Sequence, residues 1–392
     1  MDPVRLLDLT RLLSRWGKGP MTGVDRVEFA YLRHFLELDS PVFGLVRSAL
    51  GFLLLDRAGM RLLLADVPVQ ALSDLVGRIA YRGDPIRGAA EATLRRVAVA
   101  RSSRRGLGRM LRRYVPGGGG YFNVGHANLD ERAFRQLRRA GWSIAVLVHD
   151  TIPLDHPEFA RKDQIEPFRR KMQVVALQAD RVTHPTKAAR AATEAQFAPF
   201  GRVPPGVVAP LGVPVPEPRP QDLPFAPQSP YFLCLGTIEP RKNHLLLLDV
   251  WQTLPAPVPH LYIVGRRGWS NAAVFDRLDR LSPEAPVHEV AGLSDGAVAA
   301  LMQGAQALLF PSFAEGFGLP AVEAAALGVP VIASDLAVFH ELLGENAVYL
   351  QPTDSYSWLE TIRAWTKPTA QATLRQTPPS WQVHFMIIFD QV

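Results

Sequence analysis

The chain has 392 residues, of which 47% are hydrophobic and 20% charged, with a formal net charge of +6. This composition excludes a disordered chain, and the length predicts two hydrophobic cores. The single cysteine, Cys234, excludes a disulfide framework and a cysteine zinc site, and it fits a reducing compartment.

The N-terminal residues 1–19 include Asp2 and Asp8 and lack the pattern of a secretory signal, so we expect the mature chain to start here. The longest uncharged stretch near helical length, residues 296–313, is interrupted by Gly304 and Pro311. It therefore predicts helix, turn and strand rather than a membrane span. We expect a cytoplasmic protein, with the inner face of the cell membrane as a candidate peripheral location.

Short apolar runs at 41–47, 121–125, 143–150 and 181–186 predict an α/β domain over residues 1–213. Residues 66–120 interrupt this pattern and are predicted to form a basic insertion or flap. Eight arginines lie between 95 and 113. They are either a solvated helix face or a surface for anionic lipids. Nucleic acid is not an expected partner, because the segment lacks interleaved aromatic residues and a recognisable reading module.

Eleven of the 32 residues from 199 to 230 are proline, so neither a helix nor a central strand can persist there. We place a linker at 214–230. Beyond it, six short apolar runs alternate with segments of helical period over 231–366. Such strands are parallel and covered on both faces, which predicts a doubly wound domain with ligands at the carboxyl ends of its strands. Residues 367–392 form a tail that is a candidate to cross back to the first domain.

Two motifs in the second domain carry charge where ligands bind. In GTIEPRKN, Arg241 and Lys242 open a helix, where cations are unfavourable unless an anion is bound. A bound diphosphate would pair with both side chains and with the free backbone amides. The alternative interpretation is that both are solvent-facing basic residues on a loop. In FPSFAEGFGLPAVEAAALG, Glu315 follows a strand and Glu323 lies in a helix of small apolar residues. Glu323 needs a partner, either a ligand diol such as ribose or a buried arginine.

These motifs, together with VAGLSD and GVPVIASDLAVFHELLGENAVYL, resemble the family 4 retaining glycosyltransferases of the GT-B fold over about 231–365. MTGVDRV, VLVHDTIP, RVTHPTKAA and VVAPLGVP are similar to the family's N-terminal half. The resemblance implies two doubly wound Rossmann-like domains facing each other across an interdomain cleft. It also implies transfer of a hexose, of mannose or glucose type, from a nucleotide-diphosphate sugar.

The resemblance assigns roles to individual residues. Lys242 and Arg241 would neutralise the donor diphosphate, Glu323 would hold the ribose, and Glu315 would contact the donor sugar. His149 would lie near the reacting sugar carbon, so that the catalytic set is His149, Glu315 and Lys242. The remaining donor-binding positions are glycine-loop, strand-end and helix-start residues: Gly23, Gly236, Thr237, Gly292, Leu293, Phe317, Gly318 and Leu319.

Two features depart from the family pattern. Thr237 stands where many members have a phosphate-binding arginine, and only about 25 residues follow TIRAWTK. The sequence contains no Asp-x-Asp motif or metal cluster, so we expect transfer without a metal or other cofactor. The family resemblance implies retention of the anomeric configuration, with the acceptor attacking the face that the leaving group vacates.

The expected acceptor is a glycan or a lipid-linked oligosaccharide used for cell-surface polysaccharide, with an anionic membrane as a candidate partner of residues 95–113. A nucleotide-sugar epimerase or hydrolase of the same fold, and a non-catalytic partner subunit, remain alternatives.

Overall fold

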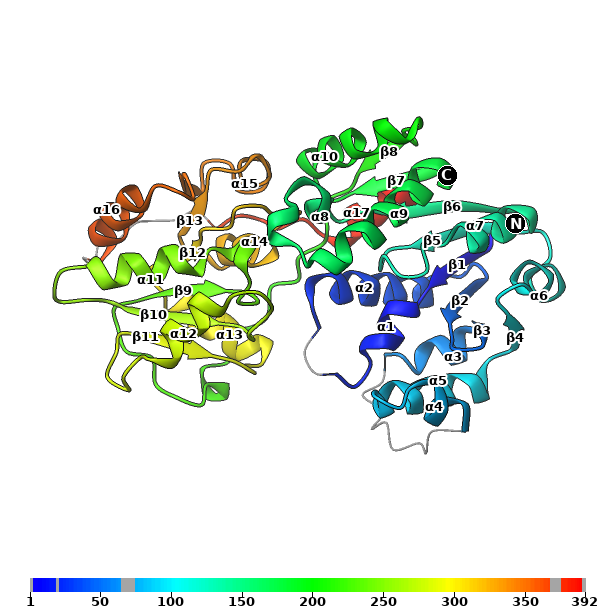
Figure 1. Ribbon diagram of the computed structural model, residues 1–392, viewed down its shortest axis with the longest axis horizontal. Helices are drawn as coiled ribbons and strands as arrows, with labels where there is room; N and C mark the ends of the chain where they lie inside the picture. The colour runs from blue at the N-terminus through cyan, green and yellow to red at the C-terminus, as the bar shows by residue number, and fades with distance from the viewer. Residues whose placement is uncertain (1–2, 19–20, 65–74, 367–374, 390–392) are drawn as a thin grey trace. The chain divides into compact units, whose positions relative to one another are not determined.

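The computed structural model describes residues 3–18, 21–64, 75–366 and 375–389, and it divides into two compact units. Unit 1 comprises Met1–His149, Pro167–Pro185 and Thr193–Val208, and unit 2 comprises Asp150–Glu166, Thr186–Ala192 and Ala209–Val392. Figure 1 labels their elements. The sequence analysis placed the boundary at 214–230, whereas the main change of unit occurs at residues 208 and 209.

Unit 1 contains an eight-stranded sheet in the order β4-β3-β2-β1-β5-β6-β7-β8. β3 pairs antiparallel with β2 and β4, and the other neighbours are parallel. The strands are β1 (Arg5–Asp8), β2 (Val42–Arg47), β3 (Gly51–Leu55), β4 (Ala100–Ser103), β5 (Gly119–Asn123), β6 (Trp142–Leu147), β7 (Arg181–His184) and β8 (Gly206–Val208).

The helices of the first half follow the strands in the alternation that parallel pairing requires. They are α1 (Thr10–Arg15), α2 (Gly23–Glu37), α3 (Arg57–Arg61), α4 (Leu75–Ala80), α5 (Pro85–Val97), α6 (Leu107–Tyr114), α7 (Glu131–Arg139), α8 (Ile152–Asp155), α9 (Lys162–Gln178) and α10 (Lys187–Phe197). Short 3-10 turns lie at Pro157–Phe159 and Ala198–Phe200.

The described part of the predicted insertion 66–120 is folded into unit 1. β4 extends the sheet beside β3, and β5 lies next to β1 at its centre. The arginine run is not uniformly solvated, because Arg95 is buried and pairs with the buried Glu91 at 2.8 Å. Arg109 and Arg112 on α6, by contrast, are exposed.

Unit 2 contains a six-stranded, fully parallel sheet in the order β11-β10-β9-β12-β13-β14. This confirms the doubly wound domain that the alternating apolar runs predicted. The strands are β9 (Tyr231–Leu235), β10 (His260–Val264), β11 (Val287–Val290), β12 (Leu308–Phe310), β13 (Val331–Ser334) and β14 (Ala347–Leu350).

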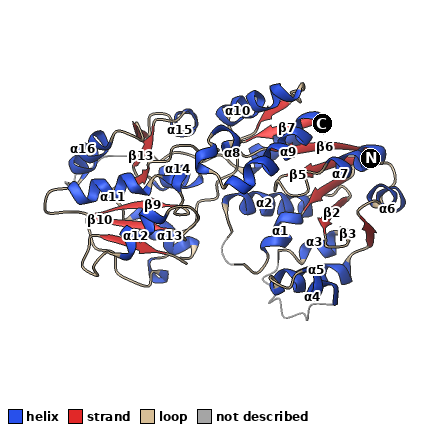
Figure 2. Cartoon of the chain, in the orientation of Figure 1, coloured by secondary structure: helices blue, strands red, loops and turns tan. Residues whose placement is uncertain are grey.

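Apart from α17, the helices of the second half lie in two layers over this sheet (Figure 2). α11 packs with α12 and α16, whereas α14 packs with α13 and α15. Their bounds are α11 (His244–Thr253), α12 (Ala272–Asp279), α13 (Asp295–Gln303), α14 (Leu319–Leu327), α15 (Ala337–Leu343), α16 (Ser355–Trp365) and α17 (Trp381–Phe389), with 3-10 turns at Pro220–Asp222 and Pro240–Lys242, the latter labelled η4.

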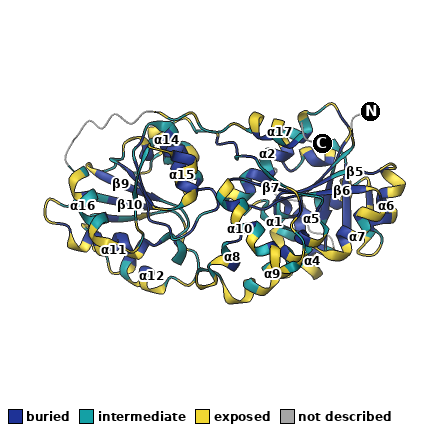
Figure 3. Ribbon diagram, turned by 90° about the horizontal axis from the view of Figure 1, so that it is seen from above, coloured by how far each residue is buried: buried dark blue, intermediate teal, exposed yellow. Residues whose placement is uncertain are grey.

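The cores are built from strand residues and the inner faces of the helices, while outward helix faces are exposed (Figure 3). In unit 2, Phe232, Leu247 and Trp358 are fully buried members of one apolar cluster. The tail helix α17 is fixed to the segment after β8, since the ring of His384 donates to the carbonyl groups of Ala209 and Pro210 within 3.1 Å. The facing of the two domains across a cleft stays a prediction.

Candidate functional site

The centre of the unit 2 sheet places two chain segments side by side. β9 and β12 are neighbours, although the chain visits β10 and β11 between them. The strand order therefore reverses between β9 and β12, and the loops that leave their carboxyl ends diverge. In open α/β sheets, such a switch point is where ligands bind. The predicted motifs GTIEPRKN and FPSFAEGFG are these two loops.

Backbone contacts hold the two loops together. The amide of Phe313, after β12, donates to the carbonyl of Arg241 at 2.9 Å. Asn243 adopts a left-handed conformation with φ 54°, and its side chain donates to the Pro352 carbonyl at 2.8 Å. The turn η4 is consequently fixed on both sides, which positions the side chains of Arg241 and Lys242.

Arg241, Lys242 and Glu315 form a partly buried ion cluster at the switch point. Oε1 of Glu315 lies 2.5 Å from Nζ of Lys242 and 2.8 Å from Nη1 of Arg241. Arg241 also pairs with Glu239 at 2.9 Å and donates to the Ala314 carbonyl at 2.6 Å. The side chains of Lys242 and Glu315 are only 12% and 7% exposed, so solvent screens this pair weakly.

The Glu315 carboxylate of this cluster is charged at neutral pH. Burial by itself would raise the pKa of Glu315, but Arg241 and Lys242 lower it to about 2. Burial lowers the pKa of Lys242, and Glu315 opposes that shift. The neighbouring His244 adds no charge, because burial and then Lys242 lower its pKa to about 4. The site thus presents fixed cations balanced by carboxylates.

The loop between β12 and α14 supplies the backbone side of the site. Gly318 is left-handed with φ +85°, and a Cβ there would lie 2.7 Å from Cε1 of Phe339. Within the described chain, the amides of Phe317 and Gly318 make no hydrogen bond to a carbonyl. The loop is also tied to Thr186, whose hydroxyl donates to the Gly316 carbonyl at 3.4 Å. Free amides at a helix start can bind an anion.

The other predicted donor residues of unit 2 lie at separate positions. Gly236 ends β9 with φ +144°, and a Cβ there would lie 3.4 Å from Cε of Lys242. Glu323 lies within α14 and is 7% exposed. Gly292 and Leu293 follow β11, and among the described residues neither is joined to the Arg241 cluster by a hydrogen bond or ion pair. Thr237 packs beside Gly268.

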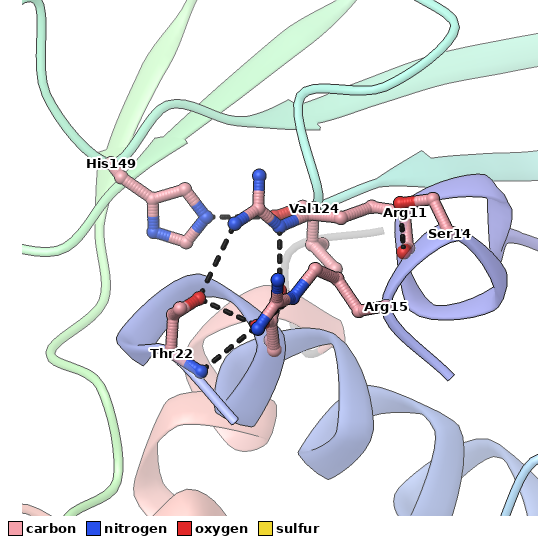
Figure 4. A network of polar contacts seen from close by, with 7 residues as sticks. Arg11, Ser14, Arg15, Thr22, Val124 and His149 are labelled. Carbon is pink, nitrogen blue, oxygen red and sulfur yellow. Dashed lines mark hydrogen bonds and ion pairs between the residues drawn. The ribbon is translucent and has the colours of Figure 1, made fainter. Parts of the chain in front are cut away.

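The predicted glycine loop lies in unit 1, where Gly23 is the first residue of α2. The Thr22 amide donates to Asp25 at 2.9 Å, and Nε of Arg11 donates to the same carboxylate at 2.8 Å. Arg15 approaches it at 3.3 Å. Burial would raise the pKa of Asp25, but the hydrogen bonds from Thr22 and the charge of Arg11 lower it. Arg11, Arg15 and Thr22 therefore converge and anchor the loop (Figure 4).

His149 also lies in unit 1, two residues after β6. Its Nε2 donates to the Val124 carbonyl at 2.7 Å (Figure 4), and the side chain is buried. The ring of His126 lies 5.0 Å away, centroid to centroid. Burial is the main cause that holds the pKa of His126 well below its usual range, and the charge of the neighbouring His149 ring adds to it. The hydrogen bond to Val124 fixes the tautomer and orientation of the His149 ring.

Several neighbours of these residues were missed in the sequence. Glu239 precedes Pro240 in the quoted motif, yet its pairing with Arg241 could not be read from spacing. The Asp25 anchor had a local signal, because Thr22 and Asp25 have the spacing of a capping box. Arg11 and His126 had no local signal. They lie on α1 and in the loop after β5, and they approach Asp25 and His149 only in the folded chain.

Two properties of the described residues bear on the wider expectations. No helix is long and apolar enough to span a bilayer. No group of three or more His, Cys, Asp or Glu side chains could hold a metal ion. The roles of the site residues and metal independence stay predictions.

The second half of the chain matches a known sequence family. Residues 217–374 match the family model described as glycosyl transferases group 1. O-antigen chain mannosyltransferase B of Escherichia coli is 35% identical over 127 residues, covering 32% of this chain and 33% of that protein. The serotype-specific mannosyltransferase WbdA of Escherichia coli is 29% identical over 248 residues, covering 58% and 30%. The matches thus span about a third of each relative's length.

Solved structures extend the fold similarity to nearly the whole chain. HepE of Anabaena, in complex with UDP and glucose, has a TM-score of 0.62 at 16% identity and covers 98% of this chain and 96% of its own. WaaG, a glycosyltransferase involved in lipopolysaccharide biosynthesis, has a TM-score of 0.55 at 16% identity, with coverages of 92% and 90%. At this identity the similarity shows the fold alone. Residues 217–374 are therefore similar to the glycosyl transferases group 1 family, and the whole chain has the GT-B fold.

Proposed function

We propose that this protein is a retaining, metal-independent glycosyltransferase of cell-surface polysaccharide biosynthesis. It moves a hexose of mannose or glucose type from a nucleotide-diphosphate sugar to a glycan or lipid-linked acceptor. The mannosyltransferases to which parts of this chain are similar support a sugar-transfer role. The observation that carries the proposal is the cluster of Arg241 and Lys242 with Glu315 at the switch point of the unit 2 sheet.

The cluster suits a diphosphate leaving group. Two partly buried cations face one shared carboxylate oxygen, and the amides of Phe317 and Gly318 lie just before the adjacent helix α14. A diphosphate offers more anionic oxygens than one carboxylate, and cations that are already fixed stabilise developing charge with little reorganisation. In the proposed complex, Lys242 and Arg241 contact the phosphates, while Glu315 accepts hydrogen bonds from sugar hydroxyls.

The transfer step balances without a cofactor. The bond between the anomeric carbon and the diphosphate oxygen breaks, and its electron pair stays with the diphosphate. The acceptor hydroxyl forms the new bond to the same carbon, and its proton passes to a phosphate oxygen. The sugar becomes oxocarbenium-like between these events. His149, oriented by Val124, is proposed to lie beside the reacting carbon.

The experiment is a thermal-stabilisation screen of the full chain against GDP-mannose, UDP-glucose and related nucleotide sugars, followed by transfer assays with and without EDTA. Binding to the native state raises the melting temperature, and the stabilisation grows with the logarithm of ligand excess over Kd. We expect stabilisation by one donor, lost in Lys242→Ala and kept in Lys162→Ala, an exposed lysine outside the cluster. Equal stabilisation of both variants would refute the assigned site. Release of free sugar or isomerised donor without acceptor would favour the hydrolase or epimerase alternative.

A further inference from the structure

Unit 1 contains a pocket of ≈ 590 Å³ that no step above uses. It lies beyond the carboxyl end of β2, beside the loop that follows β5, and the turn after α4 and the start of α5 close another side. Four cationic side chains line it and a single carboxylate opposes them: Arg47, Arg87, Arg104, Lys171 and Asp130. A pocket with this lining favours an anionic ligand.

The carboxylate of Asp130 only partly balances the four cations of the pocket. Across the described chain, none of the four forms an ion pair with a carboxylate. Glu91, the nearby buried acid, is instead engaged by Arg95, by the hydroxyl of Tyr81 at 2.6 Å and by the Ala49 amide. The pocket therefore keeps its excess positive charge.

Two of the cations pack against aromatic rings, and Nζ of Lys171 donates to the His126 carbonyl at 3.2 Å. The guanidinium of Arg47 lies 5.1 Å from the Phe52 ring, and that of Arg87 lies 4.9 Å from the Tyr81 ring. Nε of Arg87 is buried and has no hydrogen-bond partner. Burial, and then the neighbouring Arg104, lower the pKa of Arg47. Such crowding of like charge is unfavourable unless an anion relieves it.

Exposed apolar side chains stand at the same end of unit 1. Leu75 and Ile79 of α4 are 70% and 58% exposed, and Ile86 of α5 is 40% exposed. α4 and α5 meet at Gly77 and Gly88, where an added Cβ on Gly77 would come within 2.6 Å of the Gly88 carbonyl. This close packing leaves the isoleucines and Leu75 outside the helix interface. The same two helices supply Ala80 and Arg87 to the pocket.

We propose that this pocket binds the phosphate or diphosphate group of a lipid-linked acceptor, with the apolar side chains of α4 and α5 contacting the first part of its hydrocarbon chain. The inference rests on the proposed function and names the acceptor class. Arg47, Arg87, Arg104 and Lys171 supply the charge, and the carboxylate of Asp130 limits how many anions enter. An uncharged glycan would leave these cations unused.

The test measures binding of farnesyl diphosphate, inorganic diphosphate and farnesol to the full chain by calorimetry. All variants are made in a Lys242→Ala background, so that diphosphate binding at the proposed donor site is weakened equally in each of them. We expect Arg104→Gln and Arg47→Gln each to weaken farnesyl diphosphate binding by about tenfold or more, because each removes a charge-assisted contact. Arg109→Gln, an exposed arginine of the same segment outside the pocket, is the matched control and should stay within about twofold.

A second comparison tests whether the hydrocarbon part of the ligand contributes to binding. Farnesyl diphosphate should bind more tightly than inorganic diphosphate, and Ile79→Ser should reduce that preference without changing inorganic diphosphate binding. Equal binding of the two diphosphates would overturn the lipid-linked acceptor. Unchanged binding in both Arg104→Gln and Arg47→Gln would overturn the pocket. Because Arg104 is exposed, its substitution does not threaten folding. Donor stabilisation in the Lys242-intact chain is measured separately, so failure here is distinguishable from failure of the proposed function.

Discussion

Nζ of Lys242 lies 2.5 Å from Oε1 of Glu315, although 73 residues separate them in the chain. The contact joins the loop after β9 to the loop after β12, across the point where the strand order reverses. Lys242 also lies 4.4 Å above the Phe310 ring. A lysine held between a carboxylate and an aromatic face is oriented before any donor arrives, and this preorganisation lowers the cost of binding.

Replacing Lys242 with alanine should weaken donor binding by about ten- to a hundredfold, because a charge-assisted hydrogen bond contributes about 1.5–3 kcal/mol. Lys242→Arg should recover only part of the loss, since a planar guanidinium does not fit a site made for a point charge. Calorimetric titration with the donor found in the screen measures both. Lys162→Ala serves as the control, and donor affinity in Lys242→Ala equal to that of the parent chain would contradict the assignment.

Glu315 should make unit 2 sensitive to acid. Its pKa is about 2 in the folded protein against an ordinary value of 4.5. A depressed pKa stabilises the folded state above the unfolded value, and this stabilisation is lost as the pH falls from about 4.5 toward 2. Glu315→Gln should remove this part of the acid dependence. Chemical denaturation at pH 3 and pH 7 measures it, and a parallel pH dependence in the variant and the parent would contradict the prediction.

The alternating apolar runs of the second half predicted the parallel sheet of unit 2, because strand period and helix period are local properties of the chain. They also placed Lys242 and Glu315 at strand ends. They could not show that Arg241 divides its contacts between Glu239 and Glu315, since that pairing depends on which strands are neighbours. Likewise, the arginine run gave no sign that Arg95 would be buried against Glu91. Long-range packing decides such pairs.

Gly318→Ala should destabilise unit 2 by about 1–3 kcal/mol, because a non-glycine residue is strained at φ +85° and its Cβ would collide with Phe339. Gly201→Ala is the matched control. Gly201 is also left-handed, with φ +83°, but a Cβ there would meet no atom within 4 Å. Thermal unfolding of the two variants separates collision from backbone strain. Equal melting temperatures would mean that the Phe339 contact relaxes without cost.

His149 gives a prediction that separates chemistry from binding. If its ring lies beside the reacting sugar carbon, His149→Ala should lower kcat by about 10²–10⁴-fold, the range for a group acting in the transition state. Affinity for the nucleotide diphosphate alone should stay within about twofold, because the ring would not contact the phosphates. Single-turnover kinetics and nucleotide titration measure the two quantities.

The control for this variant is His126→Ala, because the two rings are neighbours in unit 1. Nε2 of His126 donates to the Leu147 carbonyl at 3.0 Å, within the strand that leads to His149. Its loss should lower the melting temperature and reduce kcat less than the loss of His149. A His126→Ala variant with the larger fall in kcat would reverse the assignment, since the ring near the sugar would then be His126. A proportional loss of kcat and stability in both variants would instead make both histidines structural.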